Sequence, residues 1–408
     1  MLSGKYWPFH PKPLPDEILS SWIVRTALGN GLLPSTFCQL EFNDPRLLAL
    51  DIDRTERAHV ITRMAEKTGT AQDSAEQTVL RSLQGELVEG WVAHGRMRWL
   101  LYAGARHRLR RLAGPQFCPR CLAEDDHPYF RRSWRLALYA ACPHHSVILL
   151  DRCPDCQAPL MPYRAEQLHL CGSCDSDLRT SAAQPADFPA LVLHRRNSLA
   201  LERGWTTLCE TDFLRSHLYF DLLYQILRIL YTGKRCGRLR TVIADQWGGD
   251  DPAISFPRRE LEAFSPSQRH RLLALAARLL EGWPYRFVGA CAEAGVWEAY
   301  ALFDVKDTPY ALAEPIRRYL CRAVYAPAEG EVLAAMAFLR RQGIDPSQHR
   351  LKPYVGDTQI ASRLLAVEAN TRSDGPVRRG SRASDGSASS LASSDALQGG
   401  SHRRRTPT

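Results

Sequence analysis

The sequence predicts a mainly α-helical protein in which a cysteine-rich central module separates two helical regions. Three observations lead to this fold class. Apolar residues recur at helical spacing in residues 1–112 and 183–365, and cysteine pairs gather in residues 113–182. The third observation is that residues 366–408 are rich in Ser, Gly and Arg and hold almost no large apolar side chains. Such a segment cannot bury enough surface to fold, so we expect a disordered basic tail there.

The bulk composition limits the class of protein further. The chain has 408 residues, of which 45% are hydrophobic and 24% charged, so two or three globular domains fit into it. No apolar run approaches the roughly 18 residues that cross a bilayer, and the N-terminus lacks the apolar core of a signal peptide. We therefore expect an intracellular protein without a membrane partner. The net charge of +9 fits a polyanionic partner, although the basic tail contributes part of it.

Residues 16–31, DEILSSWIVRTALGNG, predict the first helix. Asp16 is suited to cap its start, and the glycines at Gly29 and Gly31 end it. Pro34 then opens a short second helix. The two helices have the proportions of a helix-turn-helix unit. The apolar stripe of the first helix consists of Ile18, Leu19, Trp22, Ile23 and Ala27.

A second helix pair has the spacing of a DNA-binding helix-turn-helix. We expect helices over residues 55–67 and 73–83, joined by a turn at Gly69, which suits the left-handed position at a helix end. The second helix would present Asp73 and Glu76 to DNA, and an acidic face is poorly suited to phosphates. Two interpretations stay open: a DNA reader, or a helix pair used for packing or protein contact.

The segment 95–111 mixes arginines with Trp99 and Tyr102. Guanidinium groups bind phosphates through paired hydrogen bonds, so the segment is a candidate for nucleic-acid contact. The alternative is a solvated basic edge that leads into the cysteine-rich module. The candidate nucleic-acid-binding residues are Arg96, Arg98, Arg106, Arg108, Arg110 and Arg111.

Two amphipathic helices are expected in the C-terminal helical domain. Ser265 followed by Pro266 is a favourable start for the second of them. Their apolar faces are expected to form core rather than a cofactor pocket. These faces consist of Phe213, Leu214, Leu218, Leu222 and Leu223 in the first helix and of Leu272, Leu273, Ala276 and Leu279 in the second.

The cysteines carry the strongest signal in the sequence. Seven of the twelve lie between Cys118 and Cys174, six of them in three CxxC pairs and the seventh in a CxxH. In an intracellular chain this pattern indicates metal binding rather than disulfides. Zinc takes four nitrogen or sulfur ligands in a tetrahedron, so four pairs predict two zinc sites. The expected ligands are Cys118, Cys121, Cys142 and His145, chosen over His144 for its CxxH spacing, and Cys153, Cys156, Cys171 and Cys174.

Two connectivities are compatible with this spacing. Sequential pairing gives a site of three cysteines and one histidine followed by an all-cysteine ribbon, whereas interleaved pairing gives a cross-braced module. In both, protein ligands fill all four positions around each ion, so we expect structural zinc. Binding on the order of 10 kcal/mol could stabilise a segment with little core of its own. The sequence lacks GxxxxGK[ST], HExxH and GxSxG motifs, and we do not expect an enzyme.

The order of these features resembles the TniQ family, which is related to the TnsD target selectors of bacterial transposons. The resemblance runs over about residues 10–180, through LPDEILSSWIVRTALGNG, the TGT helix pair, CPRC, YFRRSWRLALYAACPHHSVILLDRCPDC and CGSC. Its most specific part is Tyr129 and Trp134, followed by CxxH and CPxC.

The resemblance implies a non-catalytic accessory protein of transposition in the bacterial cytoplasm, associated with the nucleoid. Such a protein recognises a target, which is DNA or a DNA-bound complex. It recruits an AAA+ ATPase, of the TniB or TnsC type, that directs a DDE transposase. We expect the first 110 residues to contact the ATPase, and a homodimer is a reasonable assembly. The alternative functions are a zinc-containing transcription regulator that reads an operator through residues 55–84, and a hydrolase with an unrecognised site.

Overall fold

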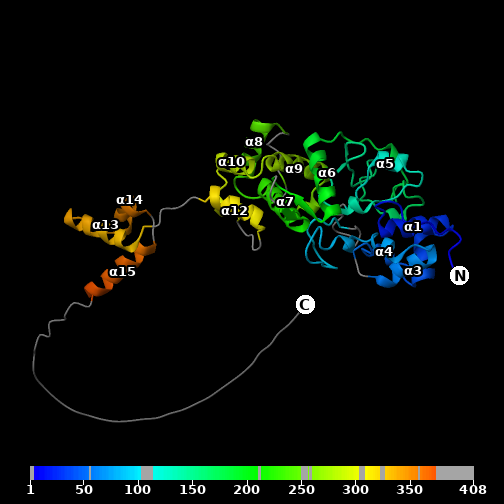
Figure 1. Cartoon of the computed structure of the whole chain (residues 1–408), viewed down its shortest axis with the longest axis horizontal. Coiled ribbons are helices and arrows are strands. Elements are labelled where there is room, and N and C mark those ends of the chain that lie inside the picture. The colour runs from blue at the N-terminus through cyan, green and yellow to red at the C-terminus, as the bar shows by residue number, and fades with distance from the viewer. Residues whose placement is uncertain are drawn as a thin grey trace, which may run out of the picture. The chain divides into compact units, whose positions relative to one another are not determined.

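The computed structural model describes residues 4–54, 57–102, 114–209, 213–249, 256, 260–302, 308–321, 327–356 and 359–373. Over these ranges the chain is mainly helical, as predicted, with two short two-stranded sheets (Figure 1). The chain divides into two compact units, Met1–Arg322 and Ala323–Thr408. The predicted boundaries at residues 112 and 182 fall inside the first unit. In the ranges that the structure describes, no helix is both long enough and apolar enough to span a bilayer.

The first unit opens with α1 (Leu19–Gly29), α2 (Pro34–Phe42), α3 (Ala58–Thr68) and α4 (Gln72–Glu76). The predicted cap of α1 at Asp16 is wrong, because the helix begins after Ile18 and Asp16 accepts a 3.2 Å hydrogen bond from the Ser133 amide instead. A distant side chain takes the role of the cap. The Asp53 carboxylate accepts a 2.7 Å hydrogen bond from the amide of Ser20, in the first turn of α1.

The second helix pair forms only in part. The Gly69 residue ends α3 with φ 63°, as predicted. The expected helix 73–83 is wrong, because α4 ends at Glu76 and residues Leu80–Leu83 form a separate 3-10 turn. Between the two, the carbonyl of Thr78 accepts a 3.0 Å hydrogen bond from the Leu19 amide at the start of α1. This tertiary contact draws the backbone out of the helix.

The central segment has few regular elements. It contains α5 (Pro119–Glu124) and the antiparallel strands β1 (Ala141–Cys142) and β2 (Val147–Ile148), which pair Cys142 with Val147. Most of the remaining backbone runs through turns. A segment with so little secondary structure depends on side-chain contacts or bound metal for its order.

The rest of the first unit is helical and contains one hairpin. Helices α6, α7 and α9 pack together beside the central segment (Figure 1). The elements are α6 (Phe188–Arg203), β3 (Trp205–Thr207), β4 (Phe213–Arg215), α7 (Ser216–Tyr231), α8 (Cys236–Trp247), α9 (Pro266–Leu280), α10 (Tyr285–Ala294), α11 (Glu298–Ala301) and α12 (Tyr310–Tyr319).

The apolar face predicted around residue 213 is partly wrong. Phe213 and Leu214 lie in β4 rather than in a helix, and Leu218 of α7 is exposed. Leu222 and Leu223 are buried as expected. Helical periodicity continues through the hairpin, so the sequence pattern did not reveal where the strand gives way to the helix.

Helix α9 agrees with its prediction. Ser265 and Gln268 form a reciprocal capping box at its start, and Leu272, Leu273, Ala276 and Leu279 are all buried. The buried Arg269 of α9 ties the helix to the central segment. Its guanidinium donates to the Gln116 side chain at 3.0 Å and to the Ala137 carbonyl at 3.2 Å. One continuous core runs through the first unit from Trp7 to Leu320.

The second unit contains α13 (Glu329–Arg341), α14 (Gln348–Val355) and α15 (Gln359–Ser373) around a small core of its own. Helix α15 covers residues 366–373, which the sequence assigns to the tail. Leu364 and Leu365 pack against the core, and Glu368 forms an ion pair with Arg340 of α13, so the helix continues past the apolar residues. Residues 374–408 lie outside the described residues.

Candidate metal centres and the adjoining cleft

The first cluster joins the start of α5 to the β1–β2 turn. The Nδ1 atom of His145 lies 3.4 Å from the Sγ of Cys118, 3.3 Å from that of Cys121 and 3.5 Å from that of Cys142. The Sγ atoms of Cys121 and Cys142 are 3.5 Å apart. All three cysteines are buried. The structure thus brings together the four residues of the sequential pairing.

The second cluster joins the two following pairs, with all four sulfur atoms within 4.8 Å of one another. The Sγ atoms of Cys153 and Cys174 are 3.7 Å apart, as are those of Cys156 and Cys171. Cys156 and Cys174 are exposed, so this site lies at the surface. A hydrogen bond with Ser176 lowers the pKa of the Cys174 thiol to about 6, which favours the thiolate that a metal requires.

The distances between ligand atoms fit a tetrahedral metal and exclude disulfides. A tetrahedron with metal–sulfur bonds of about 2.3 Å has sulfur–sulfur edges of about 3.8 Å, and a nitrogen at about 2.0 Å gives edges of about 3.5 Å. Sulfur atoms in a disulfide are only about 2.05 Å apart. The measured separations of 3.3 to 3.7 Å match the edges of such a tetrahedron. Both clusters could therefore hold a metal ion.

Three of the four half-sites share one backbone turn, which no sequence motif revealed. The amide four residues after the first cysteine donates to that cysteine's carbonyl, and the donor residue has positive φ although it is not glycine. Side chains other than glycine adopt this conformation rarely, so surrounding contacts must hold each turn in place. The turns are Cys142 to Ser146 (2.9 Å, φ 51°), Cys153 to Gln157 (3.0 Å, φ 58°) and Cys171 to Asp175 (2.9 Å, φ 58°).

The His145 ring is held on its far side by an acidic residue. Its Nε2 atom lies 2.8 Å from the carboxylate of Glu124, at the end of α5. A carboxylate on one ring nitrogen fixes the other nitrogen as the metal ligand and orients the ring. His144 is placed differently, because its ring lines a neighbouring cleft.

Comparison with known proteins adds the family. Residues 8–149 match the family model described as TniQ. The chain carries a TniQ domain. The matched range includes the whole first cluster and ends before Cys153, the first residue of the second. A search of the curated proteins found no match. The TniQ domain associates this protein with transposition and target selection, as an accessory protein.

Within the TniQ domain, Arg131 braces the loop between the two halves of the first cluster. Its guanidinium lies 4.3 Å from the ring centroid of Tyr129 and 4.7 Å from that of Trp134. It also donates to both carboxylate oxygens of Asp125, at 3.2 and 2.8 Å. Both aromatic residues belong to the most specific part of the sequence resemblance, and the structure shows that they enclose an arginine. Cation–π contacts of this kind contribute roughly 0.5–2 kcal/mol each.

A buried ionic network fastens the N-terminal helices of the TniQ domain to its cysteine-rich part. Arg135 donates to Asp51 at 2.8 Å, to Asp53 at 3.0 Å and to the Leu101 carbonyl at 2.9 Å. Asp53 is the residue that caps α1 through Ser20. No motif marks these residues, because Arg135 and the two aspartates come together from segments more than 80 positions apart in the chain.

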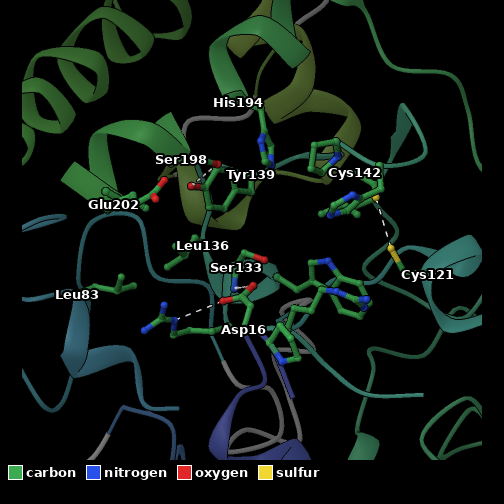
Figure 2. A pocket seen from close by; sticks show the side chains of 18 of the residues that line it. Asp16, Leu83, Cys121, Ser133, Leu136, Tyr139, Cys142, His194, Ser198 and Glu202 are labelled. Carbon is green, nitrogen blue, oxygen red and sulfur yellow. Dashed lines mark hydrogen bonds and ion pairs between the residues drawn. The ribbon is translucent and has the colours of Figure 1, made fainter. Parts of the chain in front are cut away.

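A cleft of about 670 Å³ adjoins the first cluster. Figure 2 shows Cys121 and Cys142 on the right of it, Leu83 on the left, Asp16 below, and His194 and Ser198 of α6 above. Burial lowers the pKa of His194 to about 4, so its imidazole is neutral at pH 7. Because Cys121 and Cys142 of the first cluster line this wall, the shape of the cleft depends on that cluster.

The arginines predicted to bind nucleic acid divide into two groups. Arg96 forms an ion pair with Glu260, and Arg98 forms one with Asp221 at 3.2 Å. To bind nucleic acid, both arginines would have to give up the ion pair with their carboxylate partner and form one with a phosphate. Arg106, Arg108, Arg110 and Arg111 lie outside the described residues.

Proposed function

We propose that this protein is a non-catalytic accessory factor of transposition that recognises a target and recruits an AAA+ ATPase, with two structural zinc ions. The observation that carries the proposal is the TniQ match over residues 8–149, together with the two closed clusters of four ligands. The ATPase would supply nucleotide hydrolysis, and through it a DDE transposase would supply strand transfer.

Zinc is the metal best suited to the ligands present. Three thiolates with one imidazole, and four thiolates, are both usual ligand sets of structural zinc. All four positions of each tetrahedron would be filled by side chains, which leaves none for a substrate. The ions would hold the three left-handed turns and keep the wall of the cleft in shape.

An exposed apolar face on α2 supports a protein contact in the N-terminal region. Leu33 and Leu40 are 62% and 52% exposed, and their spacing of seven residues places them on one side of the helix. Leu33 also lines a surface groove with Pro45 and Tyr163. We assign the ATPase contact to this face.

The test begins with metal content and then measures capture. Elemental analysis of freshly purified, reduced protein is expected to give two zinc ions per chain, and less than one would refute the zinc assignment. Next, the immobilised protein is mixed with a purified AAA+ ATPase of the TniB or TnsC type. The double variant Leu33→Ser/Leu40→Ser should lose at least tenfold in capture, whereas the control Val92→Ser, at a residue that is 50% exposed, should keep it. If the unchanged protein, the double variant and the control captured the ATPase equally well, the assignment of the contact to this face of α2 would be wrong.

We also keep the arginines of residues 106–111 as proposed DNA contacts. Changing Arg106, Arg108, Arg110 and Arg111 to glutamate should weaken DNA binding and lower its dependence on salt. Unchanged affinity and salt slope would remove them from the proposal.

A further inference from the structure

A second basic surface lies beside α6 and β3 in the first unit, where no sequence motif marks a binding residue. A groove of about 260 Å³ runs between α6 and β3. Arg195, Leu199 and Arg203 follow one another at intervals of four residues, so they share one side of α6 over about 12 Å. Trp205 and Thr207 of β3 form the opposite wall.

The arginines of this groove differ from Arg96 and Arg98, because no acidic group in the described part of the chain forms an ion pair with them. Among the described residues, no carboxylate forms an ion pair with Arg195, Arg203 or Arg215, which pairs with Trp205 across the hairpin, and all three side chains are exposed. Glu202, the nearest carboxylate in the sequence of α6, lines the cleft of Figure 2 instead. The positive charge of the groove is therefore free to bind an anion.

A fourth arginine that lines the groove is held in place by neighbouring groups. Arg196 donates to the carbonyl of Thr207, and its guanidinium lies 5.3 Å from the ring centroid of Tyr219. Both partners are uncharged, so Arg196 keeps its full positive charge in a fixed position. Such a fixed guanidinium loses less entropy than a free one when it binds a phosphate.

Two exposed aromatic rings extend the basic groove along the hairpin. The rings of Trp205 and Phe213 stack at 5.2 Å and an angle of 28°, and they remain 37% and 65% exposed. The Arg203 guanidinium lies 5.9 Å from the Trp205 ring. Surfaces that combine free arginines with exposed aromatic rings are typical of nucleic-acid binding, because the arginines bind phosphates and the rings contact bases.

We propose that the groove between α6 and the β3–β4 hairpin binds the phosphodiester backbone of DNA. The row on α6, about 12 Å long, corresponds to about three to four base steps of a duplex at about 3.4 Å per step. The inference does not rest on the recruitment of an ATPase, because DNA binding can be measured on the purified protein alone.

The experiment compares two triple variants of the full chain that lose the same charge. In the groove variant, Arg195, Arg203 and Arg215 become alanine. In the control, Arg63, Arg286 and Arg318 become alanine, and each of these forms an ion pair with a glutamate. Circular dichroism and zinc content establish that both variants are folded. Fluorescence anisotropy then measures binding of a labelled duplex of about 30 base pairs, and of one of its strands, between about 50 and 300 mM salt.

The groove variant should bind at least tenfold more weakly at about 100 mM salt. Its plot of log affinity against log salt should be shallower by about 2 to 3 on duplex, since each lost phosphate contact contributes about 0.9. The control should change the slope by less than about 1. A loss on the duplex or on the single strand supports the site and identifies the form of DNA that it takes. Wild-type affinity and slope on both DNAs, or an equal loss in the control, would overturn the proposal, whatever the outcome of ATPase capture.

Discussion

Removing the charge of Arg135 should be among the most destabilising single changes in the TniQ domain. The side chain is only 3% exposed and donates to Asp51, Asp53 and the Leu101 carbonyl. In Arg135→Met the carboxylate of Asp53, which is 6% exposed, would stay buried without a cation. Breaking a buried ion pair on one side costs about 3–5 kcal/mol. We expect the unfolding free energy of the zinc-loaded protein to fall by that amount.

A second substitution separates the charge from the shape of the side chain. Asp53→Asn carries no charge, keeps an oxygen that accepts the hydrogen bond of the Ser20 amide, and replaces the second oxygen by an NH2 group that can donate to the Ser20 hydroxyl. The double variant Arg135→Met/Asp53→Asn should therefore be more stable than the sum of the two single changes predicts, by about 1–3 kcal/mol. Urea unfolding followed by circular dichroism at saturating zinc measures all four proteins. Arg98→Met is the control: its partner is Asp221, both side chains are exposed, and we expect a cost of at most about 1 kcal/mol.

The loss of unfolding free energy caused by Arg135→Met should also depend on pH. Burial raises the pKa of Asp53 to about 6 in the native protein, even though Arg135 opposes this shift, and loss of the arginine raises it further. A carboxyl whose pKa is higher in the folded state than in the unfolded state destabilises the fold as pH rises from about 4 through the folded pKa. The loss of unfolding free energy in Arg135→Met should therefore be largest at about pH 7 to 8 and become smaller towards about pH 5. The reasoning would be refuted if Arg135→Met lost no more unfolding free energy than the Arg98→Met control, or if its loss did not change with pH.

Three further predictions concern other parts of the first unit. Burial lowers the pKa of His194 from 6.5 to about 4, so the imidazole takes up a proton at a higher pH in the unfolded state than in the folded state. The unfolding free energy should therefore drop by about 3 kcal/mol between pH 7 and 4. The variant His194→Phe should show a smaller drop, measured in titrations that also monitor the zinc content. In Gly172→Ala the new Cβ would lie 2.7 Å from the Met161 carbonyl oxygen, so elemental analysis should find about one zinc per chain instead of two. Ser265→Ala removes the reciprocal cap with Gln268 and should cost about 1 kcal/mol in urea unfolding, with a result below about 0.3 kcal/mol counting against the cap.

Local spacing predicted the two clusters of candidate ligands because a CxxC or CxxH turn brings its two side chains together without help from the rest of the fold. The start of α9 at Ser265 was predictable for the same reason, since a capping box involves residues three positions apart. What the sequence did not predict depends on contacts across long separations. The cap of α1 comes from Asp53, 33 positions away from Ser20, and a propensity argument pointed to Asp16 instead.

The early end of α4 has the same origin. Nothing in residues 73–83 stops a helix, but the Thr78 carbonyl is required at the start of α1, and this contact outweighs the helical preference. Likewise, the groove beside α6 consists of single arginines whose significance appears only when the hairpin folds back over the helix. In each case tertiary contacts, rather than residue preference, determine the local structure.

The anchoring of Arg269 has a practical consequence for dissecting this protein. The residue comes from α9, 120 positions beyond the end of the TniQ match, yet it is fully buried against Gln116 and Ala137 inside the matched range. A fragment cut at residue 149 would expose that contact surface and leave the side-chain oxygen of Gln116 without the donor that Arg269 supplies. Chimaeras that exchange recognition modules between relatives should instead be joined between Arg322 and Ala323, where the continuous core has already ended.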